Sequence, residues 1–385
     1  MKYLAVLGRL SDISLAELAA QFGPSVKKIA PNLAVFESDD IVDINRFGGT
    51  LKFGRLITEN PIDFLMQLKN GGEKFTGKFT IGVSDYSRNA SSRKSQSEAM
   101  RLKKIITRQG RSARVLANTE AAHSTATSHH NQMGEKIGHV EFLVVGKEWY
   151  VLIGVQNITA YKNRDQVRPA RDAKVGMLPP KLAQILINLC GPLKTGSRLL
   201  DPFCGTGVVL QEAFLMDFQP YGTDLSERMI EYSEKNLKWI AEQNKQKHLA
   251  KTSESSEEFK LAVGDATTLT WTEKIDAVAC ETYLGAPMSL PPVEVKLKEQ
   301  KTECNRIVLG FLKNILPQIE AGTPLALAVP AWKRPEGHYE RMNIIDEIQD
   351  LGYNVCKLNH LSQEDMLYFR DGQIVAREII VLRKK

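Results

Sequence analysis

The stretch "LLDPFCGTGVVLQEA", residues 199–213, constrains the fold of this chain more than any other segment. Apolar residues run into Asp201, a turn with Gly205 and Gly207 follows, and an apolar helical segment begins directly after it. Glycine lets a backbone adopt positive φ and approach a ligand closely, and the helix N-terminus adds partial positive charge. The pattern predicts a strand, a turn and a helix of an open α/β sheet, with a ligand against the turn.

Predicted strands and helices alternate from about residue 180 to the last residues of the sequence. The strands are "RLLDPF", "PYGTDLS", "FKLAVGDA", "KIDAVAC", "PLALAVP", "YNVCKLNH" and "REIIVLRK". The helices are "KLAQILINLCG", "VVLQEAFLM", "ERMIEYSEKNLKWIAEQ", "NRIVLGFLKNILPQI" and "YERMNIIDEIQDLG". This alternation predicts a doubly wound α/β sheet.

Aspartates come at the ends of three successive strands of this sheet. Asp201 precedes the glycine turn, Asp224 follows about twenty residues later, and Asp265 ends the third strand. Each one alone is often a helix cap, but together they fit an adenosyl ligand, with Asp224 on ribose hydroxyls. The turn has neither the G-x-G-x-x-G pattern nor a following Lys-Ser/Thr, which disfavours a nicotinamide site and a P-loop. We therefore predict S-adenosylmethionine as the cofactor.

The N-terminal part has a different pattern. "KYLAVLG", a helix capped near Ser14 and the strand pair in "VKKIAPNLAVFES" predict a small α+β unit over residues 1–60. Beyond it, the strand "KFTIGVSDYS" leads to a basic helix, "SEAMRLKKIITRQG", which Gly110 ends. The strands "ARVLAN" and "EFLVVGKEWYVLIGVQ" follow, with a polar, partly helical segment between them.

Positive charge is concentrated in this first half. Residues 1–172 hold 25 Lys and Arg against 17 Asp and Glu, and residues 69–114 hold 12 against 3. Such an excess favours a polyanionic partner, although a solvated basic helix face would give the same count. The candidate RNA-binding residues are Arg93, Lys94, Arg101, Lys103, Lys104, Arg108, Arg111 and Arg114.

Cysteine usage and hydropathy narrow the protein class. The five cysteines form no C-x-x-C pair, and no apolar run approaches the roughly 20 residues that span a bilayer. His129 and His130 are adjacent and diverge on a helix or strand, so we expect no metal site. We expect a monomeric cytoplasmic protein with reduced thiols, without a membrane segment.

The segment "NRDQVRPARDAKVGMLPPKLAQILINLCG" followed by "LLDPFCGTGVVLQEA" resembles the tRNA guanine-N2 methyltransferases that join a THUMP module to a Rossmann-fold methyltransferase domain. The nearest branch methylates the guanosine at position ten of tRNA. "TIGVSDYS", the basic helix and "HSTATSHHNQM" resemble the THUMP part. The resemblance implies a ferredoxin-like unit at 1–60, a THUMP RNA-binding domain at 61–160, a linker at 161–175 and an S-adenosylmethionine-dependent methyltransferase domain at 176–385.

The resemblance also implies roles for particular residues. Asp201, Gly205 and Gly207 would hold the methionine end of the cofactor, and Asp265 the adenine. The full set of implied cofactor contacts is Met177, Pro179, Asp201, Pro202, Gly205, Gly207, Asp224 and Asp265, with Leu178 beside the first two. The THUMP module would dock the acceptor end of tRNA, so the basic residues would contact phosphates.

The chain departs from the family at the catalytic motif. Where the family carries Asp-Pro-Pro-Tyr-Gly, this chain has Glu281, Thr282, Tyr283, Leu284 and Gly285. A guanine amine is a poor nucleophile, and acceptors that hold its N–H bonds align the nitrogen with the methyl group. Glu281 keeps a carboxylate one methylene further out, and Tyr283 is the candidate for stacking on a flipped base.

Three interpretations remain open for this variant motif. The favoured one is an active enzyme on a guanine N2 amine of tRNA, with Glu281 and Tyr283 as catalytic residues. The second is a different acceptor atom or nucleotide, and the third is a silent protein that binds cofactor and tRNA. An amino methyltransferase acting on DNA is disfavoured by the basic first half, and a small activating partner is not indicated.

Other side chains have ambiguous roles in the sequence. Cys204 is expected to be a packing residue of the turn. Trp332 either walls the base site or belongs to the core. Arg168, Arg171 and Asp172 either orient the linker or meet RNA.

Overall fold

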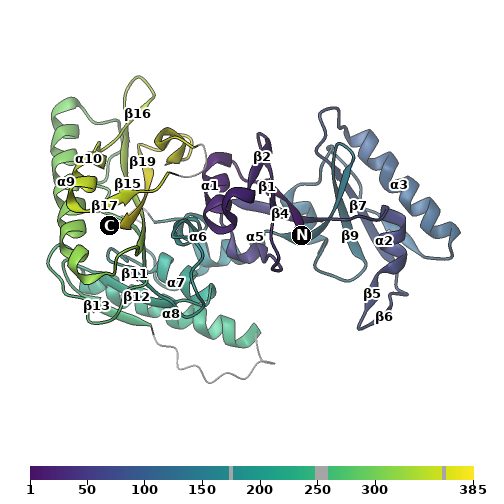
Figure 1. Ribbon diagram of the computed structural model, residues 1–385, viewed down its shortest axis with the longest axis horizontal. Coiled ribbons are helices and arrows are strands. Elements are labelled where there is room, and N and C mark those ends of the chain that lie inside the picture. Colours follow the sequence, from purple (N-terminus) through teal and green to yellow (C-terminus); the bar gives the residue numbers. More distant parts are fainter. Residues whose placement is uncertain (173–176, 248–258, 358–360) are drawn as a thin grey trace. The chain divides into compact units, whose positions relative to one another are not determined.

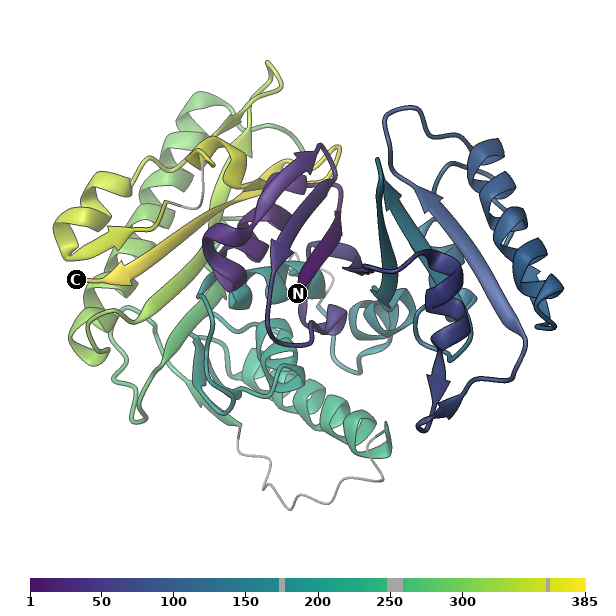
Figure 2. The ribbon, with the colours of Figure 1, turned by 45° about the vertical axis from the view of Figure 1, so that its right-hand side comes forward.

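The computed structural model describes residues 1–172, 177–247, 259–357 and 361–385. Contacts divide the chain into two compact units (Figures 1 and 2). The first comprises Met1–Ser11 and Phe22–Ala160, and the second comprises Asp12–Gln21 and Tyr161–Lys385. The division after residue 160 falls at the predicted end of the RNA-binding domain. None of the described helices combines the length and apolar character that crossing a membrane requires.

The first unit is built on one eight-stranded sheet. In spatial order its strands are β2 (Lys27–Ala30), β3 (Leu33–Glu37), β1 (Lys2–Leu7), β4 (Thr50–Leu56), β10 (Glu148–Val155), β9 (His139–Val145), β7 (Phe79–Asp85) and β8 (Ala113–Val115). β7 is parallel to β8 and β9, and the other neighbours are antiparallel. β4 pairs with β10, so strands from both sides of residue 60 share this sheet. A domain boundary there stays a prediction.

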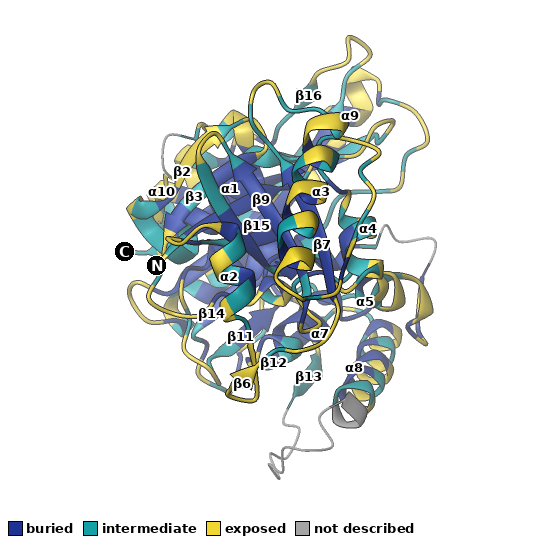
Figure 3. Cartoon of the chain, turned by 90° about the vertical axis from the view of Figure 1, so that its right-hand side faces the viewer, coloured by how far each residue is buried: buried dark blue, intermediate teal, exposed yellow. Residues whose placement is uncertain are grey.

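The basic helix of this unit is α3 (Ser92–Arg108), which starts before the predicted Ser97 because the Ser91 side chain accepts a hydrogen bond from Lys94 N. Its buried face includes Ala99, Leu102 and Ile106, and Figure 3 shows exposed residues on its other side. Gly110 follows with φ +77°, as its predicted role in ending the helix requires.

The remaining elements of the unit are short. They are α2 (Pro61–Gln67), α4 (Thr125–His130), α5 (Ile158–Lys162) and the hairpin of β5 (Lys69–Asn70) and β6 (Glu73–Lys74).

The structure of the N-terminal part differs from the sequence analysis in one strand that was missed and two predictions that were wrong. β4 was not predicted, because buried Lys52 and Gly54 interrupt its apolar pattern. The strand predicted over 141–156 is a hairpin, since Gly146 takes φ +61° and turns the chain between β9 and β10. Helix α1 (Ser11–Phe22) begins before Ser14, which lies buried inside it and cannot cap it.

The second unit contains the predicted α/β sheet. Its strand order is β13 (Lys260–Val263), β12 (Gln219–Asp224), β11 (Arg198–Asp201), β14 (Ala277–Glu281), β15 (Pro324–Lys333), β19 (Val375–Lys384) and β17 (Tyr353–Val355). The first five are parallel, and β19 is antiparallel to both neighbours. Two short strands, β16 (Tyr339–Glu340) and β18 (Leu367–Tyr368), pair with β15 and β19. This is a Rossmann-type sheet, as predicted.

Helices cover both faces of this sheet because successive strand residues point to opposite sides. Val278 and Cys280 of β14 share a core with Phe311 of α9 (Glu294–Ile315), which also includes residues of α10 (Ile345–Leu351). The helices α6 (Pro180–Leu189), α7 (Val208–Leu215) and α8 (Glu227–Lys247) belong to the other layer (Figure 1). α9 starts well before the predicted Asn305, and α10 is shorter than predicted.

The predicted linker is packed into the second unit as far as residue 172. α5 continues into a π-helical segment, Asn163–Val167, and both Tyr161 and Ala170 are buried. Residues 173–175 of the predicted linker lie outside the described part of the chain. The segment 161–172 is therefore part of the wall behind the glycine turn.

Candidate cofactor site and basic helix

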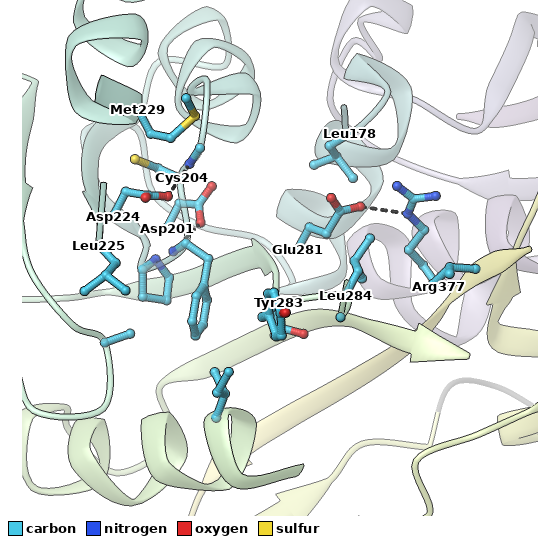
Figure 4. Close-up of a pocket in the computed structure, with 18 of the residues that line it drawn as sticks. Leu178, Asp201, Cys204, Asp224, Leu225, Met229, Glu281, Tyr283, Leu284 and Arg377 are labelled. Atoms are coloured by element: carbon cyan, nitrogen blue, oxygen red, sulfur yellow. Dashed lines mark hydrogen bonds and ion pairs between the residues drawn. The ribbon is translucent and has the colours of Figure 1, made fainter. Parts of the chain in front are cut away.

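A cavity of about 1080 Å³ opens in the second unit at the carboxyl ends of β11, β12, β13 and β14 (Figure 4). Parallel strands of an open α/β sheet present their carboxyl ends at one edge, where ligands of this fold bind. Asp201, Asp224, Asp265 and Glu281 all line it. The volume slightly exceeds the roughly 300–1000 Å³ of single-ligand sites, which is consistent with a site for two reactants.

The glycine turn has the geometry that its sequence demands. Gly205 lines the cavity with φ +52°, and its N–H donates to Asp224 Oδ2 at 2.9 Å. Gly207 does not line the cavity; it takes φ +78° at the start of α7, where a Cβ would lie 2.8 Å from Ser233 Oγ. Gly207 is thus required for helix packing, whereas Gly205 leaves the backbone open to a ligand.

Two buried side chains of α8 fix this turn. Ser233 Oγ donates to Gly205 O at 2.8 Å. Asn236 Nδ2 donates to Thr206 O at 2.8 Å and to Ala170 O at 2.9 Å, while its Oδ1 accepts from Ala170 N at 2.9 Å. Sequence analysis missed both residues, although polar residues spaced by three on the inner face of an amphipathic helix are a usable signal.

Asp201 is a buried carboxyl group at the end of β11. Its side chain is 2% exposed, and Oδ1 accepts a hydrogen bond from Phe203 N at 3.1 Å. Burial raises the pKa of Asp201 well above its usual value, the Phe203 hydrogen bond opposes this, and the negative charges of Asp224 and Glu281 add to it. A cationic ligand group beside Asp201 would relieve this repulsion.

The other two aspartates are partly engaged in local turns. Asp224 Oδ1 accepts from Ser226 N at 2.9 Å in addition to the Gly205 bond. Asp265 Oδ1 accepts from the Thr267 N–H and hydroxyl, which lower the pKa of Asp265. Among the described residues, Asp265 Oδ2 has no hydrogen-bond partner, so this oxygen is available to a ligand.

The segment before α6 meets the cavity only in part. Met177 and Leu178 line it, as does Pro202, but Pro179 does not. Pro179 is the N-cap of α6, and its carbonyl accepts from Leu182 N at 2.9 Å. Pro179 thus has a structural role at the start of α6, and its contact with the cofactor stays a prediction.

The ambiguous charged residues before α6 make contacts within the second unit. Arg168 is 2% exposed, and its Nη2 lies 2.9 Å from Met177 Sδ. Arg228 Nη2 donates to Asp172 at 2.9 Å. Burial makes Arg168 unsuitable for phosphate contact and favours the orienting role.

Glu281 stands at the tip of β14 and faces the cavity. Its Oε1 accepts a hydrogen bond from Arg377 Nε of β19 at 2.7 Å, and the two side chains are 14% and 5% exposed (Figure 4). Burial raises the pKa of Glu281, and the charge and hydrogen bond of Arg377 oppose that shift. Sequence analysis missed Arg377 because 96 residues separate it from Glu281.

The tip beyond Glu281 is held without the family's prolines. Thr282 is buried, and its N–H donates to Ala328 O at 3.0 Å, which extends the β14–β15 pairing. Gly285 takes φ +87°, and the next N–H, of Ala286, donates to the Gln300 side chain at 2.7 Å. Tyr283 and Leu284 both line the cavity.

Three residues with ambiguous chemistry are structural. Cys204 lines the cavity and packs with Leu210 and Leu237, and burial raises the pKa of its thiol well above the usual value, which favours a packing role. Trp332 is fully buried in the core with α9 and does not line the cavity. His129 Nε2 lies 3.1 Å from Thr159 Oγ1. Within the described ranges, no cluster of His, Cys, Asp and Glu is arranged to hold a metal.

The candidate RNA-binding residues divide into two groups. Several are exposed on α3 or half-buried there and point away from its apolar face: Arg93, Lys94, Arg101, Lys103, Lys104 and Arg108. Of these, Arg101 is paired with Glu98, and Lys94 Nζ donates to Asn89 O at 2.8 Å.

The remaining two candidates, Arg111 and Arg114, lie outside α3 and make contacts with the sheet. Arg111 donates to Phe75 O, and its guanidinium lies 4.9 Å from the centre of the Phe79 ring. Arg114 Nε donates to Thr80 Oγ1 at 2.9 Å. The contacts of Arg111 identify it as a packing residue, whereas Arg114 is exposed and adds to the accessible charge of α3.

Parts of the chain are similar to known methyltransferases. Residues 168–289 match the family model for the RMKL-like methyltransferase domain. The tRNA (guanine(10)-N2)-dimethyltransferase of Methanothermobacter thermautotrophicus is 31% identical over 173 residues, which cover 45% of this chain and 42% of that protein. The Pyrococcus abyssi protein of the same name is 30% identical over 135 residues, covering 34% and 36%.

The chain thus spans less than half the length of these curated relatives. The solved structure of TrmN from Thermus thermophilus aligns over all of both chains, at 17% identity and a TM-score of 0.47. The expected resemblance is confirmed over part of the chain: residues 168–289 match the model of the RMKL-like methyltransferase domain, and the chain is similar to tRNA (guanine(10)-N2)-dimethyltransferases over less than half of its length.

Proposed function

We propose that this protein transfers a methyl group from S-adenosylmethionine to the exocyclic N2 amine of a guanosine in tRNA. The observation that carries the proposal is that Glu281 lines the same cavity as Asp201, Asp224 and Asp265. The acceptor class comes from the relatives, which are named for guanine N2 of tRNA.

The residues of the cavity fit the proposed cofactor. Asp224 ends β12, where a carboxylate accepts hydrogen bonds from ribose hydroxyls, and Asp265 Oδ2 is available to an adenine amine. Asp201 is destabilised by burial and by two nearby negative charges, so it favours the cationic methionine end. When bound, S-adenosylmethionine supplies an electrophilic methyl group on a positively charged sulfur.

Glu281 is suited to align the amine. One N–H of the guanine amine would donate to Glu281 Oε2, which turns the nitrogen lone pair toward the methyl group. The cofactor would supply the methyl group, and Glu281 would hold the amine in line for the transfer. The nitrogen then loses a proton to Glu281, whose raised pKa suits a proton acceptor.

The polyanionic substrate would be held through the first unit. The accessible Lys and Arg residues of α3 lie on one face of a helix, which suits contacts with phosphates. Such contacts position a nucleic acid without selecting its sequence, and they weaken with added salt.

A second candidate function follows from the variant motif. Glu281 and Thr282 replace the family's Asp-Pro, and the Glu281 carboxylate is already bound by Arg377. This arrangement would also suit a protein that binds cofactor and tRNA without transferring a methyl group, or one that modifies another nucleotide.

Methyl transfer from labelled cofactor to total tRNA, followed by mass spectrometry of the nucleosides, separates these functions. We expect label in N2-methylguanosine, and we expect Glu281→Gln to lower kcat by about 10²–10⁴-fold. Glu378→Gln is the matched control, because Glu378 is a buried carboxylate paired with Arg341 outside the cavity. Cofactor binding without transfer would support the silent protein, and label in another nucleoside would support a different acceptor.

A further inference from the structure

Arg377 presents unused hydrogen-bond donors to the cavity. The residue is 4% exposed and lines the cavity, and its Nε is bound to Glu281 Oε1. Neither Nη nitrogen has a hydrogen-bond partner among the described residues, and neither is sealed from solvent. A guanidinium that is buried in the wall and bonded at only one nitrogen is poised to meet a ligand.

The pair offers an ordered row of polar atoms. Arg377 Nη donates, Glu281 Oε1 lies beside Arg377 and keeps a lone pair, and Glu281 Oε2 accepts. The Watson–Crick edge of guanine has the complementary order, with O6 as acceptor, N1–H as donor and the N2 amine as donor. Enzymes that act on a flipped base read this edge by hydrogen bonds.

The position of the pair fixes the direction in which guanine would lie. In Figure 4 the cofactor aspartates Asp201 and Asp224 lie on one side of Glu281, and Arg377 lies on the other. With O6 toward Arg377, the N2 amine therefore lies on the side of the cofactor residues. The reacting nitrogen and the recognised oxygen thus take opposite ends of the row.

We propose that Arg377 is a specificity-determining residue. It donates a hydrogen bond to guanine O6, while the Glu281 carboxylate accepts hydrogen bonds from N1–H and from the N2 amine. This inference rests on the proposed function and names the base feature that the site selects. A purine with an amine in place of O6 brings a donor against the Arg377 donors, and its unprotonated N1 faces the Glu281 carboxylate. Such a base is rejected because buried polar groups are left unpaired.

The test uses a tRNA transcript with 2,6-diaminopurine in place of the guanosine that mass spectrometry identifies as methylated. This base keeps the N2 amine but lacks O6 and the N1 proton. We expect the wild-type protein to prefer guanosine in kcat/KM by about a hundredfold or more. Arg377→Met should shrink this preference by about ten- to a hundredfold, which is the range for one hydrogen bond from a charged donor.

Two further variants serve as controls for the effect of Arg377→Met. Arg377→Lys keeps the charge and a donor and should retain part of the preference, which provides a second measurement if Arg377→Met folds poorly. Arg341→Met should leave the preference unchanged, because Arg341 binds Glu378 and does not line the cavity. Cofactor affinity and thermal unfolding are measured for each variant.

The outcomes distinguish this inference from the proposed function. If Arg377→Met lowers kcat/KM for both substrates by the same factor, Arg377 has a structural role and the inference fails while the methyltransferase assignment stands. If the wild-type protein methylates no tRNA, both the proposed function and the inference that rests on it fail.

Discussion

Each unit of the protein contains a buried pair of a carboxylate and a cation, and the two pairs differ in how fully they are bonded. In the first unit, Glu141 accepts from Lys52 Nζ at 2.7 Å and from the hydroxyls of Ser84 and Ser128 at 2.6 Å each. Lys52 also donates to His123 O at 2.8 Å. Both members of that pair are at most 1% exposed.

The pair of Glu281 and Arg377 in the second unit is bonded at one atom of each partner. Burial of charge is costly unless hydrogen bonds satisfy the groups. The first pair meets this requirement and fastens the segment around His123 and Ser128 to the sheet. The second leaves donors and an acceptor facing a cavity, so its unpaired groups are available to a ligand.

The largest stability effect should come from breaking the fully hydrogen-bonded pair of Lys52 and Glu141, called here the saturated pair. Lys52→Met should lower the free energy of unfolding of the first unit by about 3–5 kcal/mol, because it leaves Glu141 buried without its cation. Lys2→Met is the control, since Lys2 and Glu148 form a pair with both side chains partly exposed, for which we expect about 0–1 kcal/mol. Urea unfolding measures both variants, and equal losses would contradict the comparison.

Acid should weaken the saturated pair. Burial alone would raise the pKa of Glu141, but Lys52 and the three hydrogen bonds outweigh it and hold the pKa below its usual value. A depressed folded-state pKa adds stability above the unfolded-state value, and this is lost as pH falls through the folded-state value. Glu141→Gln should therefore cost most near neutral pH, and its deficit should shrink in acid. A deficit independent of pH in urea unfolding would contradict this assignment.

The pair of Glu281 and Arg377 should tolerate loss of its cation better than the saturated pair does. Arg377→Met should lower the free energy of unfolding of the second unit by roughly 1–3 kcal/mol, because water can reach Glu281 through the cavity. Denaturant unfolding followed at peptides of β14 and β19 by hydrogen exchange measures this. A loss of unfolding free energy as large as that of Lys52→Met would show that the two pairs contribute equally to stability.

The smallest expected change in stability is an increase, for Asp201→Asn. Since burial raises the folded-state pKa of Asp201, its ionised form costs stability at neutral pH, and Asp201→Asn should raise the thermal midpoint by roughly a few degrees. The same variant should lose cofactor affinity. In the wild-type protein, affinity should weaken as pH falls, because protonation of Asp201 competes with the cationic ligand group. Calorimetric titration of cofactor at several pH values checks this, and an unchanged affinity in the variant would refute it.

The parts of the site that sequence analysis found are those encoded within a few residues. Asp201 and Gly205 belong to one turn motif, and Asp224 and Asp265 come at the ends of the next strands, so periodicity alone locates them. Arg377 reaches Glu281 only because β19 lies two strands from β14 in the sheet. No local sequence pattern around Glu281 or Arg377 predicts that pairing.

The same reasoning explains the errors in the fold. β4 was missed because Lys52 interrupts its apolar pattern, and the partner that permits the burial of Lys52, Glu141, lies 89 residues away. Pro179 and Gly207 were assigned to the cofactor from their motif, yet each serves the start of a helix. Local patterns identify a turn, and tertiary contacts decide which of its atoms reach the cavity.

A crystal structure with bound S-adenosylhomocysteine and guanosine tests the central claim most directly. The account predicts the nucleoside of the cofactor along Asp201, Asp224 and Asp265, with guanine N2 between the cofactor sulfur and Glu281, and O6 against Arg377. A cofactor bound elsewhere, or a Glu281 carboxylate turned away from the sulfur, would contradict it.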